Sequence, residues 1–270
     1  MVTASVGFQC PECAHSGAKQ QRLVEVYRSA TQPRVTYVLL AINVAVYVVG
    51  AAFGSKLGGV HYADFDTRFS LWAGIGRTVD GSQVTTGVAN GEWWRIITGG
   101  FMHASPLHIA FNMFALWNVG TALERMIGRL RFGLIYAVSL LGGSLGALLF
   151  SNPGGSTVGA SGAIFGLFGA LVLLQLSRGI NPMQGGIAMT IGINLVLTFT
   201  IPGISAGGHI GGLLVGALAG YVLIGHNIRA AQHRETSLKV MAPIVVGLCI
   251  VLFVASIYAA HYVVLHGALV

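Results

Sequence analysis

The stretch FGLIYAVSLLGGSLGALLF, Phe132–Phe150, decides the class of fold to which this chain belongs. It contains no charged side chain, and as a helix it is long enough to span the ~30 Å hydrocarbon core of a bilayer. A membrane-spanning β-strand would need polar and apolar residues to alternate over ~10 positions. This run is instead a continuous series of mostly Leu, Ile, Val, Ala and Gly. We therefore interpret it as a transmembrane helix.

Runs of the same kind recur along the 270 residues of the chain. Charged residues make up 9% of the sequence and hydrophobic residues 54%, whereas a soluble domain carries roughly 25% charge. This composition excludes an ordinary soluble globular protein. We predict an all-α polytopic membrane protein with seven spans, the fifth and sixth of them short. The spans are Val35–Phe53, Leu107–Leu123, Phe132–Phe150, Ala160–Leu176, Ile187–Ile201, Ile210–Ile224 and Ala242–Val264.

The basic residues are distributed unequally over the two sides of these spans. Of the 15 Lys and Arg residues, eleven flank the spans on one side and four on the other. The first set is Lys19, Arg22, Arg28, Arg34, Arg125, Arg129, Arg131, Arg178, Arg229, Arg234 and Lys239, and the second is Lys56, Arg68, Arg77 and Arg95. Because basic flanks stay inside, we predict a cytoplasmic amino terminus, with Val270 outside.

The net charge of +7 then belongs to the inner face, where it meets anionic lipid headgroups. We expect membrane lipid, and no nucleic acid, as the partner of this charge. The residues before the first span hold charges and no apolar stretch, so we expect no cleaved signal peptide ahead of it.

A long segment from about Gly54 to Ala104 separates the first two spans. It is rich in aromatic residues and poor in charge, and Trp and Tyr rings settle at the membrane interface. We predict a structured lobe in the outer interface. Its aromatic residues are Tyr62, Phe65, Phe69, Trp72, Trp93, Trp94 and Phe101.

Polar side chains at membrane depth are costly and are candidates for function. His108 and Asn112 are four residues apart, which places them on one face of the second span. Ser161 begins the fourth span between the small residues Gly159, Ala160 and Gly162, and its N–H is one of the donors left over at a helix start.

His209 lies in AGGHIGGLLVGALAG at the start of the sixth span. The small-residue stripe Gly212, Gly216 and Gly220 follows it and lets a neighbouring helix approach closely. On the predicted topology, His209 shares the outer half of the membrane with the three other polar side chains. A serine beside glycines is more often a packing residue, and a lone histidine can simply hydrogen-bond a neighbouring helix. The functional hypothesis therefore depends on all four polar groups lying close together.

The four groups together predict a serine hydrolase site. Ser161 would attack a carbonyl and His209 would take and return the proton, while His108, Asn112 and the Ser161 N–H would hold the developing negative charge. No Asp or Glu occurs between Glu124 and Glu235, so a third, orienting carboxylate is not expected and the site would be a dyad.

The motifs resemble those of the rhomboid intramembrane serine proteases over roughly Val35 to Gly225. They are WWR in the long loop, MHASPLHIAFN leading into span two, ERMIG at its end, GASGAIFG at the start of span four and GGHIGGLLVG in span six. The resemblance implies that Ser161 is the nucleophile and His209 the base, with His108 and Asn112 on the oxyanion side. It also implies structural roles for five further residues: His103, Trp94, Arg95, Glu124 and Arg125.

The same resemblance implies a six-helix core with a seventh transmembrane helix at the carboxyl end, and a movable cap at Ile201–Gly208. We expect an amino-terminal segment at 1–34, a protease core at 35–225, and a linker with the seventh helix at 226–270. The expected substrates are single-span membrane proteins, and we expect no cofactor. One departure is Phe165, where rhomboids often have a tyrosine that stacks on the catalytic histidine; its ring can still stack, without the hydroxyl.

Cys10 and Cys13 form a C-x-x-C pair, with His15 close by, which supplies at most three ligands where structural zinc needs four. Some bacterial rhomboids carry a similar zinc ribbon before the first span, so the pair is either part of such a ribbon or a reduced, disordered pair. We expect a multi-pass protein of a bacterial plasma membrane. The alternatives to a protease are a catalytically silent, rhomboid-like protein that binds membrane clients, and a channel or transporter.

Overall fold

The computed structural model describes residues 2–3, 8–9, 32–54, 65, 68–79, 82–150, 155–183, 186–224 and 238–267. The chain divides into two compact units, Met1–Gln32 and Pro33–Val270. In the first unit, β1 (Val2–Thr3) pairs antiparallel with β2 (Phe8–Gln9). Cys10, Cys13 and His15 lie outside the described residues, so neither interpretation of the pair, as part of a zinc ribbon or as reduced cysteines, is tested.

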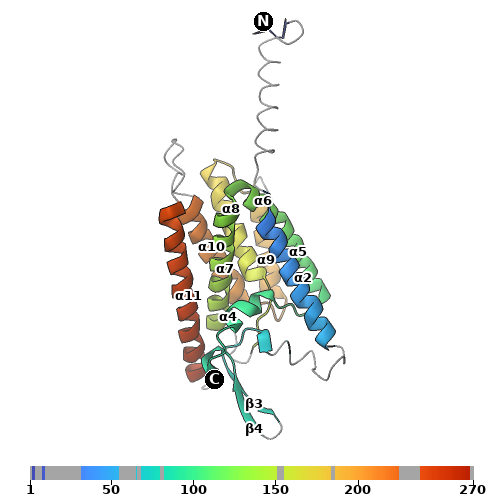
Figure 1. Ribbon diagram of the computed structural model, residues 1–270, viewed down its shortest axis with the longest axis vertical. Helices are drawn as coiled ribbons and strands as arrows, with labels where there is room; N and C mark the ends of the chain where they lie inside the picture. Colours follow the sequence, from blue (N-terminus) through green and yellow to red (C-terminus); the bar gives the residue numbers. More distant parts are fainter. Residues whose placement is uncertain are drawn as a thin grey trace. The chain divides into compact units, whose positions relative to one another are not determined.

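Each of the seven predicted spans is helical in the second unit, which confirms the polytopic helical fold (Figure 1). The second span is built from α5, the π-helical turn η3 and α6. The bounds are α2 Arg34–Gly54, α5 Pro106–Ala115, η3 Leu116–Gly120, α6 Thr121–Ile127, α7 Arg129–Phe150, α8 Ser161–Ser177, α9 Ile187–Thr200, α10 Ala206–Ile224 and α11 Leu238–Gly267.

Among the described residues, α2, α7, α10 and α11 are long and apolar enough to cross a membrane, and α8 and α9 are shorter apolar helices. The sixth span begins at Ala206, four residues before the predicted start at Ile210. The Ser205 side chain accepts a hydrogen bond from the Gly208 N–H at 3.1 Å and so caps the first turn. His209 therefore lies inside the first turn of α10.

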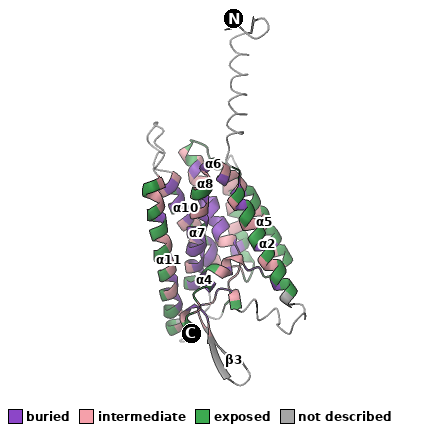
Figure 2. Ribbon diagram, viewed as in Figure 1, coloured by how far each residue is buried: buried purple, intermediate pink, exposed green. Residues whose placement is uncertain are grey.

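Helix α7 forms the centre of the second unit and packs against α8, α10 and α11. Figure 2 shows α7 mostly buried, whereas few residues of α2 and α11 are buried. Most of the exposed side chains on these outer helices are apolar, such as Val48 and Ile250. Such surfaces suit contact with lipid chains, so the core is shared by α7, α8 and α10 while the outer helices face the bilayer.

The glycines of α10 allow it to pack against α8 and α7 at backbone contact. A Cβ atom at Gly212 would overlap the backbone of Gly162, and one at Gly216 would overlap that of Gly166, both on α8. A Cβ at Gly211 would overlap the carbonyl oxygen of Gly142 on α7. The predicted small-residue stripe therefore does bring neighbouring helix backbones together.

Glu124 is fully buried in the middle of α6 and caps the start of α2. Its carboxylate accepts hydrogen bonds from the Val35 N–H at 3.0 Å, and from the N–H and hydroxyl of Thr36, both at 2.7 Å. A negative charge here is favoured by the helix dipole and satisfies donors that the helix leaves unpaired. These contacts agree with the structural role expected for Glu124.

The described part of the long loop is folded, as predicted, and contains a pair of antiparallel strands that we did not predict. Strand β3 (Ile75–Val79) pairs antiparallel with β4 (Ser82–Thr86), and the chain continues through η1 (Val88–Asn90), α4 (Arg95–Thr98) and η2 (Gly99–Phe101). Tyr62 lies outside the described residues.

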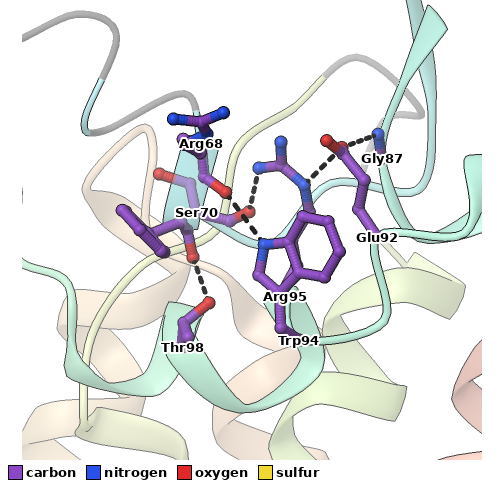
Figure 3. Close-up of polar contacts among 8 residues, drawn as sticks. Arg68, Ser70, Gly87, Glu92, Trp94, Arg95 and Thr98 are labelled. Atoms are coloured by element: carbon purple, nitrogen blue, oxygen red, sulfur yellow. Dashed lines mark hydrogen bonds and ion pairs between the residues drawn. The ribbon is translucent and has the colours of Figure 1, made fainter.

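Arg95 holds this loop together (Figure 3). Its guanidinium is buried, pairs with the Glu92 carboxylate at 2.7 Å and donates to the carbonyl of Ser70 at 2.9 Å. Glu92 in turn accepts from the Gly87 N–H at 2.5 Å, and the Trp94 indole donates to the Arg68 carbonyl at 3.3 Å. The Trp94–Arg95 pair is thus structural, as expected.

Candidate active site

The folded loop fixes the backbone that leads into α8. Leu71 and Thr157 exchange two backbone hydrogen bonds, of 3.0 and 2.9 Å, as a short antiparallel bridge. The Gly159 N–H donates to the carbonyl of Gly99 at 3.0 Å. Thr157 and Gly159, four and two residues before Ser161, are therefore tied to the loop, and Ser161 follows at a defined place as the first residue of α8.

Ser161 and His209 are in direct contact. Ser161 Oγ lies 2.7 Å from His209 Nε2, although the two residues are 48 positions apart and lie on different helices. Ser161 is partly exposed, and His209 is buried at 8% exposure. A hydroxyl in contact with an imidazole is the arrangement that activates a serine nucleophile, provided that the imidazole is neutral.

This contact depends on how closely the backbones approach beside it. Gly162 follows Ser161 and Gly208 precedes His209, and both face Gly143 of α7. A Cβ at Gly143 would lie 3.1 Å from Gly162 Cα and 3.1 Å from the carbonyl oxygen of Gly208. Three glycines therefore meet at the depth of the serine and the histidine, which lets the two side chains reach each other.

Phe165 stacks on His209, one turn after Ser161. The ring centroids are 4.2 Å apart and the planes differ by 15°. The predicted stacking is confirmed, and it is made by a phenylalanine at the position where rhomboids often have a tyrosine. The ring restricts the imidazole by contact alone.

His108 borders the same space as Ser161. Ser105 caps α5 by accepting from the His108 N–H at 3.2 Å, and Pro106 occupies the first turn. A Cβ at Gly159 would lie 2.8 Å from His108 Nε2 and 3.6 Å from Ser161 Oγ. The imidazole of His108 and the hydroxyl of Ser161 thus lie on either side of one small gap.

Asn112 is buried one turn further along α5, on the same face as His108. Its amide donates to the carbonyl oxygen of His108 at 3.0 Å. This contact lies within its own helix, so the geometry brings Ser161, His209 and His108 together and leaves Asn112 one turn away.

His103 supports this cluster from the loop. It is buried and its ring lies edge-on to that of His108, with centroids 5.1 Å apart. Burial, together with the neighbouring His108, lowers the pKa of His103 to about 4. His103 is therefore neutral near pH 7, which suits the bracing role expected for it.

Thr198 of α9 is a site residue that the sequence reasoning missed. Its Oγ1 lies 2.6 Å from His209 Nδ1, the ring nitrogen that faces away from Ser161. A signal was present, because Thr190, Asn194 and Thr198 recur every four residues and form a polar line along an apolar helix. A search that considers only carboxylates as partners of His209 does not find Thr198.

The fold and the site together define a class: a helical membrane protein with a serine hydroxyl hydrogen-bonded to an imidazole between two of its helices. Residues 90–226 match the model of the Rhomboid domain, and the chain belongs to the rhomboid family. This is a family of intramembrane proteases.

Curated relatives carry the same family name. Rhomboid protease GluP of Bacillus subtilis is 41% identical over 170 residues, which are 62% of this chain and 33% of GluP. Putative rhomboid protease YdcA of the same organism is 38% identical over 143 residues, or 51% of this chain and 71% of YdcA. RHOMBOID-like protein 4 of Arabidopsis thaliana is 33% identical over 200 residues, which are 67% of this chain and 50% of that protein. The chain thus spans a third of GluP and half of RHOMBOID-like protein 4.

Proposed function

We propose that this chain is an intramembrane serine endopeptidase that works with a Ser161–His209 dyad. The observation that carries the proposal is the 2.7 Å contact between Ser161 Oγ and His209 Nε2. In the first step Ser161 Oγ attacks the carbonyl carbon of a peptide bond, and its proton passes to Nε2. His209 then gives this proton to the leaving amine, which leaves an ester on Ser161.

Water completes the cycle. A water molecule loses a proton to His209 Nε2 as it attacks the ester, and the proton returns to Ser161 Oγ when the carboxylate product leaves. The base must be neutral at both steps, so cleavage should rise with pH as His209 loses its proton. His108 interacts electrostatically with His209, and its own ionisation would contribute to the same pH profile.

The negative charge of each tetrahedral intermediate needs hydrogen-bond donors. The Ser161 N–H and the His108 side chain are candidates because both border the gap beside Ser161 Oγ. Asn112 would join them by releasing its bond to the His108 carbonyl and turning toward the substrate.

The proposed substrates are single-span membrane proteins, with membrane lipid as the surrounding partner. The proposed location is a bacterial plasma membrane with the amino terminus in the cytoplasm, on the evidence of the eleven basic residues on one side against four on the other. We retain the division into an amino-terminal segment at 1–34, a core at 35–225, and a linker with the seventh helix at 226–270.

The test is cleavage of a single-span reporter by purified chain in lipid vesicles. We expect the wild type to cut it and both Ser161→Ala and His209→Ala to lose at least ~10³-fold in rate, as is usual when a nucleophile or its base is removed. Ser177→Ala is the matched control, because Ser177 lies on the same helix and its hydroxyl donates to the Leu174 carbonyl. It should cut like the wild type.

The same experiment separates the protease from its nearest rival. If the wild type does not cut any reporter but binds it as tightly as both variants do, the chain is a client-binding member of the family. That outcome would overturn the proposal.

A further inference from the structure

Thr198 is unusual among the residues of α9. It is the only buried residue of this helix, at 4% exposure, and the rest of Ile187–Thr200 is exposed or half-buried. Other buried side chains of the site lie on α10 (His209), α8 (Phe165) and α5 (Asn112), whereas α9 contributes this one polar group. A polar side chain buried alone on an apolar helix calls for a partner that explains it.

The partner is the imidazole of His209. Thr198 Oγ1 makes two contacts: it donates to the carbonyl of Asn194 at 2.7 Å, and it lies 2.6 Å from His209 Nδ1. A hydroxyl has one proton and two acceptor lone pairs. With its proton directed to Asn194, the oxygen is left to accept, so the Nδ1–H of His209 must donate to it.

A proton on Nδ1 fixes the rest of the ring. A neutral imidazole carries a single N–H, so Nε2 then bears the lone pair. That lone pair faces Ser161 Oγ at 2.7 Å and is ready to accept its proton. In a serine triad a buried carboxylate holds the histidine in this tautomer. In the described part of the chain no carboxylate contacts His209, and the threonine hydroxyl occupies the corresponding place.

We propose that Thr198 is a positioning residue that holds His209 in the Nδ1–H tautomer through its side-chain oxygen, and so keeps Nε2 free to act as the base. The proposal rests on the proposed function. When the imidazole becomes an imidazolium, its bond to Oγ1 becomes charge-assisted and strengthens, so Thr198 also favours the proton transfer itself.

The test compares Thr198→Val, which keeps the shape and loses the hydroxyl, with Thr198→Ser, which keeps the hydroxyl. Thr190→Val is the matched control. Thr190 lies on the same helix, and its hydroxyl donates to the carbonyl four residues earlier, at 3.0 Å. We expect Thr198→Val to cut the reporter roughly ten- to a hundredfold more slowly, from the loss of one hydrogen bond to a group that becomes charged. Thr198→Ser and Thr190→Val should stay within about threefold of the wild type on the same reasoning.

A second measurement reads the tautomer directly and does not depend on cleavage. In chain labelled with ¹⁵N-histidine, the His209 signals are identified by their absence in His209→Ala. At mildly alkaline pH we expect a protonated Nδ1 and an unprotonated Nε2 in the wild type, and an increased population with the proton on Nε2 in Thr198→Val.

The outcomes separate the two proposals. A wild-type His209 with its proton on Nε2 overturns the role of Thr198, as does equal loss of activity in Thr198→Val and Thr190→Val. If the tautomer changes as expected in Thr198→Val but the wild type cuts no reporter, the positioning holds and the proposed function fails.

Discussion

The ring of Phe165 lies against one face of the His209 imidazole, and this contact restrains the base without a hydrogen bond. An aromatic pair contributes about 0.5–1.5 kcal/mol beyond the area that it buries. We therefore expect Phe165→Ala to slow reporter cleavage by roughly three- to tenfold or more, and Phe165→Tyr to keep the wild-type rate. Equal rates for Phe165→Ala and the wild type, at equal folded yield, would show that the stacking has no role.

His103 gives a second prediction, on stability. Its pKa is about 4 in the folded chain and close to 6.5 when exposed. Between these values the unfolded state binds the proton and the folded state does not, so stability falls as the pH drops from about 6.5 to about 4. The loss from this one group is at most about 3 kcal/mol.

Thermal unfolding in detergent at pH 7 and pH 5 checks this, with His103→Gln as the variant that cannot titrate. We expect a smaller fall in the unfolding midpoint for His103→Gln than for the wild type. His108, which faces His103, is present in both proteins. The difference between their falls in unfolding midpoint therefore reports the titration of His103. An identical fall in both would contradict the account.

Much of the candidate site could be predicted at the residue scale. Ser161 and His209 stand out because polar groups are rare in apolar runs, and the predicted topology places both in the outer half of the membrane; the resemblance to rhomboids implies the same pair. Thr198 could not be chosen with the same reasoning, because a threonine in a membrane helix usually satisfies itself by donating to the carbonyl four residues earlier. Only the fold reveals that its oxygen also meets His209.

At the scale of elements, the crossing of α8 and α10 controls the site. A Cβ at Gly216 would overlap the backbone of Gly166, so Gly216→Ala must push the helices apart. Overpacking of this kind costs about 1–3 kcal/mol, and a small separation of the helices breaks the 2.7 Å contact between Ser161 and His209. We expect a lower unfolding midpoint and at least roughly tenfold slower cleavage.

Gly192→Ala on α9 is the control, since a Cβ there meets nothing within 4 Å. It should leave both the unfolding midpoint and the cleavage rate close to those of the wild type. If Gly216→Ala behaves like Gly192→Ala, close packing of α8 on α10 is not what holds the dyad.

Hydropathy alone predicts some elements of this fold and not others. The spans could be predicted because each needs a long apolar run to exist in lipid. The β3–β4 hairpin was not predicted, because neither short strand alternates clearly between polar and apolar residues. The Asp80-Gly81 pair in the sequence between the two strands is a hairpin signal that can be read on its own.

At the scale of the second unit, the site and most of the basic residues that flank the spans lie at opposite ends of the helices. Ser161 begins α8, and the end of α7 meets the start of α10, because a Cβ at Gly207 would overlap Gly146. Arg129 begins α7, and Arg178 follows the end of α8. Figure 1 shows α4 and the hairpin at the end of the bundle opposite α6. This arrangement supports the proposed orientation, with the basic end inside and the site toward the outside.

The most direct test of the central claim is to find which residue reacts with an alkyl fluorophosphonate. If His209 activates Ser161, Ser161 Oγ displaces fluoride from phosphorus and His209 takes the proton, which leaves a stable adduct on Ser161. Mass spectrometry of the labelled wild type in vesicles should locate that adduct on the peptide containing Ser161, and both Ser161→Ala and His209→Ala should remain unlabelled. Labelling of another residue, or labelling that persists in His209→Ala at the wild-type rate, would contradict the claim that Ser161 is a nucleophile activated by His209.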